Sequence, residues 1–175
     1  MLSTLVFAPP AADDAARRAS ALLRTLAALV PATVEGIVRD VTLLNVGEGQ
    51  AFAEIADEAG CQLVAEQDFP AALARGVAGA RSPWIFVVKA GTIPSRIFGE
   101  EAARALEGAV ETGGALLLRE QPSGLLGRLF PALAPVAGVI LPRSRLAETR
   151  CASFAELVRR ARPARSLPTA AIGQR

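Results

Sequence analysis

The apolar residues of this chain fall into short runs that alternate with segments of helical periodicity. The clearest run, Trp84 to Val88, follows Ser82-Pro83 and precedes a polar loop, Lys89 to Pro94. A short apolar run bounded by turn-forming residues is typical of a strand that is covered on both faces. In open α/β sheets ligands bind beyond the carboxyl ends of such strands, so we expect a ligand site at the loop from Lys89 to Thr92.

The same alternation precedes this strand. Apolar runs predict strands at residues 3–8, 34–44 and 62–65, and apolar residues at helical spacing predict helices at residues 13–30, 51–59 and from 71 to the turn at 82. Pro9-Pro10 cannot continue a strand ladder, and Gly60 suits the C-cap of a helix. Successive strand-helix alternations indicate an α/β fold, a three-layer sandwich with a mostly parallel central sheet and helices on both faces.

The second half of the chain completes the predicted single domain, residues 1–175. The pattern predicts helices at residues 97–110 and 153–162, strands at 115–118 and 136–141, and a basic extended tail at 163–175. The most hydrophobic stretch, Gly124 to Pro142, is interrupted by Arg128, Pro131 and Pro135, which argues against a membrane span. Two interpretations follow: a helix packed on the sheet and then a strand, or a segment that lies on a membrane surface.

Composition narrows the function classes. The 175 residues carry 19 basic and 17 acidic side chains, a net charge of +2, which is too balanced to indicate nucleic-acid binding. The chain has no histidine, which excludes Ser-His and Cys-His nucleophile pairs and imidazole-bound metals. Cys61 and Cys151 are far apart and have no metal-ligand spacing, so we expect free thiols in a reducing cytoplasm.

The order of these segments resembles the family-2-like glycosyltransferases, which have the GT-A nucleotide-sugar-binding fold. STLVFAPP (residues 3–10) resembles the family's first strand, and AFAEIADEAG (51–60) resembles its second helix. AALARGVAGARSPWIFVVKAGTIP (71–94) matches a family segment of the type AARNAGIAAARGEWILFLDADTLP in spacing to the residue, and ASFAELVRRARPARSLPTAA (152–171) is similar to the family's end. Over most of the chain, the resemblance implies a GT-A-like (nucleotide-diphospho-sugar transferase) fold.

The resemblance implies sugar transfer from a nucleotide-diphosphate donor, with a divalent ion held by an Asp-X-Asp motif. Such an ion neutralises the charge of the departing diphosphate. In this chain the two motif aspartates fall on Lys89 and Gly91, and neither side chain ligates a metal. The Glu-Asp pair whose aspartate serves as acceptor base falls on Ser153 and Phe154, which leaves Glu156 as the nearest carboxylate.

The nucleotide side of the implied site is retained only in part. Asp40 matches the acidic residue that contacts the nucleotide base, and Pro9, Gly91 and Thr92 complete the predicted nucleotide-binding set. The resemblance thus predicts a possible nucleotide-sugar ligand without a metal site or another cofactor.

The apolar scaffold positions of this chain match those of the family, whereas the charged catalytic positions differ. For example, the family's Arg-Asn pair falls on Leu73 and Ala74. This pattern favours a catalytically degenerate relative with a binding or scaffold role. The alternative is a metal-independent transferase in which the Lys89 ammonium pairs with the diphosphate, Thr92 or a backbone N–H group assists, and Glu156 is the base.

Partners and location follow from the same observations. The non-catalytic interpretation predicts a protein partner, or the inner membrane face of a bacterium, bound through Leu125 to Leu141, and no nucleic acid. The start, MLSTLVFAPP, has no basic region before its apolar run. It therefore predicts a cytoplasmic protein, peripheral on the inner membrane if that segment binds lipid.

Overall fold

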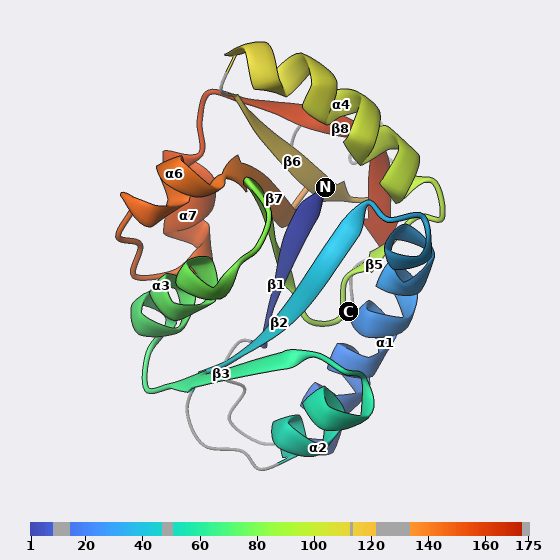
Figure 1. Cartoon of the computed structure of the whole chain (residues 1–175), viewed down its shortest axis with the longest axis vertical. Helices are drawn as coiled ribbons and strands as arrows, with labels where there is room; N and C mark the ends of the chain where they lie inside the picture. Colours follow the sequence, from blue (N-terminus) through green and yellow to red (C-terminus); the bar gives the residue numbers. More distant parts are fainter. Residues whose placement is uncertain (9–14, 47–50, 113, 122–133, 173–175) are drawn as a thin grey trace.

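The computed structural model describes residues 1–8, 15–46, 51–112, 114–121 and 134–172 (Figure 1). Its strands are β1 (Leu2–Ala8), β2 (Val38–Val46), β3 (Gln62–Glu66), β4 (Trp84–Lys89), β5 (Ile93–Pro94), β6 (Ala115–Glu120), β7 (Val136–Pro142) and β8 (Ala164–Ile172). Its helices are α1 (Ala15–Val34), α2 (Ala51–Glu58), α3 (Phe69–Gly79), α4 (Phe98–Thr112), α6 (Arg143–Ala147) and α7 (Phe154–Arg160). The predicted α/β fold is confirmed.

The sheet is mixed, which corrects the prediction of a mostly parallel one. Its eight strands lie in the order β3-β2-β1-β4-β7-β6-β8-β5. The first four strands in this order are parallel, but β7 runs antiparallel to both β4 and β6, and β5 runs antiparallel to β8. Strand β7 is inserted between β4 and β6 and runs opposite to both, so the parallel arrangement of the first four strands does not continue across the sheet.

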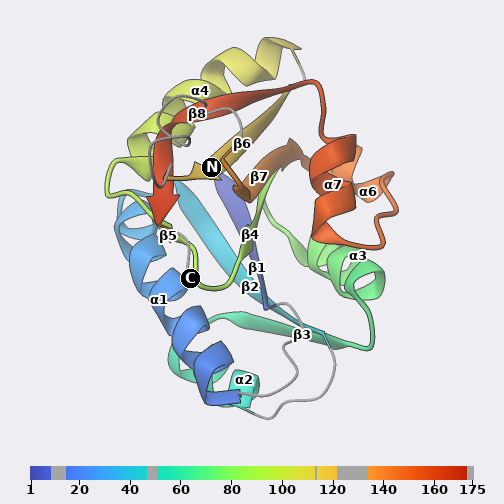
Figure 2. The ribbon, with the colours of Figure 1, turned by 180° about the vertical axis from the view of Figure 1, so that it is seen from behind.

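The two faces of the sheet carry two separate hydrophobic clusters. Along β1 the side chains alternate, so that Leu2 and Val6 join the cluster under α1, α2 and α4, while Leu5 and Phe7 join the cluster under α3, α6 and α7. The two views of the ribbon show α1, α2 and α4 on one side of β1 and β4, and α3, α6 and α7 on the other (Figures 1 and 2). Every residue of β1 is buried, as expected for a strand that is covered on both faces.

Helix α3 is built from small residues because it packs closely on the sheet. Asp68 caps it by accepting a hydrogen bond from the Ala71 N–H, and Pro70 stands in its first turn. At Gly76 a Cβ atom would lie 2.8 Å from the Leu44 Cδ2 and 3.1 Å from the Leu5 Cδ2. The absence of a side chain there lets the helix approach β1 and β2.

Two segments with predicted surface roles belong to the sheet. Within the segment predicted as a basic extended tail, residues 164–172 form β8, which pairs with β6 and β5 and buries Leu167 and Ala171. Of the segment Leu125 to Leu141, residues 136–141 form β7 between β4 and β6, which leaves this part no free apolar face for a membrane or partner. Residues 125–133 lie outside the described part.

None of the helices in the described ranges is long and apolar enough to cross a membrane.

Candidate functional site

The carboxyl ends of β1, β4 and β6 meet at one edge of the sheet. The two strands β4 and β6 run in the same direction because each is antiparallel to β7 between them. This brings Lys89, the last residue of β4, to Glu120, the last residue of β6, with 4.0 Å between Nζ and Oε1. Their side chains are 35% and 27% exposed, so Lys89 faces this edge with a carboxylate beside it.

Three aromatic rings from three elements pack beside Lys89. Phe7 of β1 lies 5.2 Å from Phe69 of α3 and 4.9 Å from Phe154 of α7, measured between ring centroids. The Lys89 ammonium lies 6.0 Å from the centroid of the Phe154 ring, within reach of a cation-π interaction. The position that the resemblance gives to the acceptor base is thus held by an apolar ring packed onto β1.

The backbone N–H groups of the loop after β4 already have acceptors. The Ala90 N–H donates to the Phe7 carbonyl at 2.8 Å, and the Thr92 N–H donates to the Lys89 carbonyl at 3.2 Å. The Gly91 N–H donates to the Ala21 carbonyl at 3.0 Å and to the Thr25 hydroxyl at 2.9 Å. Thr92 itself is only 3% exposed. An anion bound at this loop would therefore interact with the Lys89 ammonium but would receive no hydrogen bonds from these backbone N–H groups.

Thr25 is a structural residue of this loop that sequence reasoning missed. Its side chain is fully buried on α1, and its hydroxyl lies 2.9 Å from the Thr92 carbonyl while it accepts from the Gly91 N–H. Gly91 has a φ of 91°, a left-handed conformation that favours glycine. The sequence does contain a signal, because Thr25 is a polar residue on the apolar face between Leu22 and Leu29.

Glu156 lies at the start of α7 and acts there as a helix cap. Its Oε2 accepts from the Ala152 N–H at 2.9 Å, while the Ser153 hydroxyl accepts from the Glu156 N–H at 3.3 Å, a reciprocal arrangement close to a capping box. Its Oε1 lies 2.8 Å from Arg160 Nη2. The backbone hydrogen bond and the Arg160 guanidinium lower the pKa of Glu156, so the carboxylate is held as an anion within its own helix.

Asp40 is not brought together with Lys89. In the strand register Asp40 pairs with Ser3, whereas Lys89 pairs with Phe7, four residues further along β1, or about 13 Å. The Ser3 hydroxyl donates to Asp40 at 2.7 Å and accepts from the N–H groups of Arg81 and Ser82, which ties this carboxylate to the amino end of the sheet.

Asn45 occupies the place at which Asp40 was expected. It pairs with Ala8 at the carboxyl end of β2 and is 3% exposed. Gly91 and Thr92 do lie beside Lys89, whereas Pro9 lies outside the described residues. Within the described ranges, no group of three or more His, Cys, Asp or Glu side chains is placed to hold a metal ion.

Neither a family model nor a curated protein matches this sequence. Solved structures do match. Glucosyl-3-phosphoglycerate synthase from Mycobacterium tuberculosis, in complex with Mn²⁺, UDP and glucosyl-3-phosphoglycerate, is similar with a TM-score of 0.62 and 15% identity over 99% of this chain and 72% of that chain. HddC from Yersinia pseudotuberculosis is similar with a TM-score of 0.64 and 8% identity over 99% of this chain and 93% of that chain. The chain has the GT-A-like fold.

A third structure agrees with this assignment. Rv0371c from Mycobacterium tuberculosis is similar with a TM-score of 0.58 and 15% identity over 95% of this chain and 86% of that chain. At these identities the likeness concerns the GT-A-like fold, and function has to be argued from the residues at the edge of the sheet.

Proposed function

We propose that this chain is a non-catalytic binding protein built on the GT-A-like fold, a degenerate relative of the nucleotide-sugar transferases. The observation that carries the proposal is the aromatic cluster of Phe7, Phe69 and Phe154 at the carboxyl edge. A transferase needs a proton acceptor and a charge-neutralising group at its reacting centre. This edge instead presents packed aromatic rings and Lys89, whose positive charge is partly offset by the Glu120 carboxylate.

The backbone of the loop supports the same conclusion. Stabilisation of a leaving diphosphate depends on several donors that converge on its oxygens. Here the N–H groups of Ala90, Gly91 and Thr92 are hydrogen-bonded within the protein, and Glu156 is committed to its helix terminus. A single ammonium beside Glu120 is a weak substitute for a divalent ion.

A metal-independent transferase is the second candidate, and the exposure of Lys89 favours it. The Lys89 side chain is 35% exposed at the carboxyl edge, where a diphosphate could reach it. Lysine binds phosphate as a point charge. In this mechanism Lys89 would leave Glu120 for the diphosphate, and Glu156 would have to leave its cap to act as a base.

Calorimetric titration separates the two candidates. UDP, GDP, UDP-glucose and GDP-mannose are titrated into the protein with and without Mn²⁺, and again into Lys89→Ala. The binding-protein proposal predicts no heat of binding for any of these ligands up to millimolar concentration. Metal-independent micromolar binding that is lost in Lys89→Ala would overturn it in favour of the transferase, and Mn²⁺-dependent binding would overturn both.

A further inference from the structure

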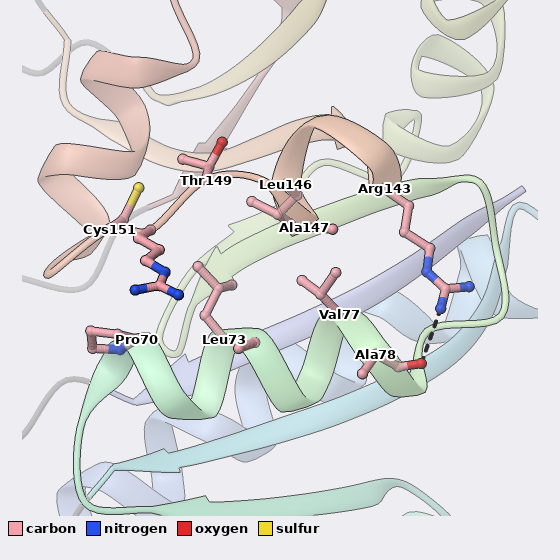
Figure 3. Close-up of a pocket in the computed structure, with 11 residues that line it drawn as sticks. Pro70, Leu73, Val77, Ala78, Arg143, Leu146, Ala147, Thr149 and Cys151 are labelled. Atoms are coloured by element: carbon pink, nitrogen blue, oxygen red, sulfur yellow. Dashed lines mark hydrogen bonds between the residues drawn. The ribbon is translucent and has the colours of Figure 1, made fainter.

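A groove runs along the outer side of α3, between this helix and the segment 143–151. It is a hollow of about 330 Å³, and Figure 3 shows the side chains of α3 on one side and those of α6 on the other. Its wall from α3 consists of Pro70, Leu73, Ala74, Val77 and Ala78, and the opposite wall consists of Arg143, Leu146, Ala147, Thr149, Arg150 and Cys151. The lining is therefore apolar apart from two arginines and one threonine.

The floor of the groove is formed by buried residues and its rim by small exposed ones. Leu73, Val77, Leu146 and Cys151 are at most 4% exposed and belong to the hydrophobic cluster on this face of the sheet. Burial raises the pKa of the Cys151 thiol, which keeps this residue a neutral part of the floor. The rim carries exposed alanines, including Ala74 and Ala147, whose small side chains let another backbone come close.

The two arginines stand at opposite ends of the apolar strip. The Arg143 guanidinium donates to the Ala78 carbonyl at 3.1 Å, at the carboxyl end of α3 (Figure 3). Arg150 precedes Cys151, which lies toward the Pro70 end of the helix. Pro70 and Ala78 are eight residues apart, which corresponds to about 12 Å along the helix axis.

Neither positive charge is neutralised within the described ranges. Arg75, on the same helix, is paired with Glu66 at 2.6 Å, but no ion pair joins Arg143 or Arg150 to a described carboxylate. Glu148 is exposed in the connection after α6 and is not part of the lining. An occupant that complements this groove carries one negative charge at each end and an apolar surface between them.

We infer that this groove binds an acidic amphipathic helix of a partner protein, with two carboxylates about seven residues apart that pair with Arg143 and Arg150. Two helical turns separate such carboxylates by about 11 Å, which matches the strip, and small apolar side chains between them fill the hollow. A fatty acid or a lipid headgroup places its negative charge at one end and leaves the second arginine unpaired. This inference rests on the proposed function as a binding protein, and it specifies the chemistry of the partner that would be bound.

The test is a selection from a displayed library of helical peptides of about 14 residues, long enough to cover the groove. Selected peptides are then measured against the protein by fluorescence anisotropy. We expect enrichment of paired acidic residues about seven apart with apolar residues between them. We also expect the double variant Arg143→Glu, Arg150→Glu to weaken binding about tenfold or more, and peptides with lysine at the two acidic positions to bind this variant instead.

Matched variants distinguish the groove from general charge and folding effects. Ala74→Glu closes the rim and is expected to abolish binding, whereas Ala53→Glu, on the exposed face of α2, leaves it unchanged. Arg159→Glu, an exposed arginine of α7 outside the groove, also leaves it unchanged. Thermal melting of every variant confirms that the fold is retained.

Several results would overturn the inference. These are selection of no peptides above background, selection of peptides without paired acidic residues, and equal binding to the double arginine variant. Arginine-dependent binding of decanoate or phosphatidylglycerol vesicles in place of peptides would assign the groove to lipids. The nucleotide titration tests the carboxyl edge and does not involve the groove, so a failure of the proposed function and a failure of this inference give different results.

Discussion

Phe154 of α7 packs against Phe7 of β1, with 4.9 Å between the ring centroids and 35° between the ring planes. This contact joins the start of the last helix to the carboxyl end of the first strand. It also puts an apolar ring where the family resemblance implies a carboxylate. The edge of the sheet is thereby stabilised by packing at a place where an enzyme would hold reactive groups.

The coupling between these two rings can be measured by a double-mutant cycle with Phe7→Leu and Phe154→Leu. Aromatic pairs contribute about 0.5–1.5 kcal/mol beyond the apolar area that they bury, so we expect a coupling free energy in this range from urea unfolding. Phe98→Leu is the control partner for Phe154→Leu, because Phe98 lies in the cluster on the other face of the sheet. A coupling of zero between Phe7 and Phe154 would mean that the aromatic cluster does not stabilise the edge.

The alternation of apolar runs and helical segments was sufficient to predict the elements from β1 to β4 and the α/β class. It could not give the direction of later strands, because a buried run is apolar whichever way it points. Residues 136–141 were predicted as a strand, but their antiparallel pairing with both β4 and β6 makes the sheet mixed. Residues 164–172 have an exposed, arginine-containing amino half that resembles a tail, and pairing with β6 makes them a strand.

At the candidate site, the position of a strand end decided which residues could be predicted. The strand predicted to end at Leu44 continues to Val46, so Asn45 reaches the carboxyl edge, whereas Asp40 lies five residues earlier in the strand, opposite Ser3. Lys89 could be placed at this edge from the sequence because it directly follows an unambiguous buried run. The role of Thr25 depends on a contact 66 residues away in sequence, between its hydroxyl and the Gly91 N–H, which no local pattern encodes.

The hydroxyl of Thr25 is expected to stabilise the loop after β4. Thr25→Val keeps the shape of the side chain but removes the hydroxyl donor to the buried Thr92 carbonyl. It also removes one of the two acceptors of the Gly91 N–H, which keeps its hydrogen bond to the Ala21 carbonyl. Buried polar groups left without a partner cost about 1–3 kcal/mol, and we expect a loss of this size in the free energy of unfolding. Thr33→Val on the same helix removes a hydrogen bond to the Leu29 carbonyl at an exposed position and should cost much less. Equal losses in the two variants would contradict the proposed role of Thr25.

The contribution of Glu156 to stability should depend on pH. Folding lowers the pKa of this carboxyl, so its stabilising effect is present at neutral pH and is lost as the pH falls from the ordinary carboxyl range through the lowered value. Glu156→Gln keeps an acceptor for the Ala152 N–H but removes the charge. The urea midpoints of the wild type and of this variant should therefore differ at pH 7 and converge in acid. Glu148→Gln, at an exposed position outside α7, is the control for the loss of a surface carboxylate.

Gly138 is the position where the centre of the sheet is expected to tolerate no side chain. It lies in β7 opposite Val88, and a Cβ atom there would stand 2.5 Å from Phe86 Cε2, 3.0 Å from Phe86 Cζ and 3.2 Å from the Val87 carbonyl oxygen. The ring of Phe86 is fully buried and packs on Phe98 with 4.9 Å between centroids, so it has no free space into which to move. Overpacking of this kind costs about 1–3 kcal/mol, and Gly138→Ala should lower the free energy of unfolding by that amount.

Gly108→Ala is the matched control for this substitution. Gly108 lies in α4, and a Cβ atom there would meet only Arg165 Nη1 at 3.8 Å, an ordinary contact. Alanine is favoured over glycine within a helix by about 0.5–1 kcal/mol, so this variant should be more stable than the wild type. Opposite signs for the two glycine substitutions in urea unfolding are the expected result. If Gly138→Ala unfolded at the same urea concentration as the wild type, β7 would have to sit further from Phe86 than the register with β4 requires.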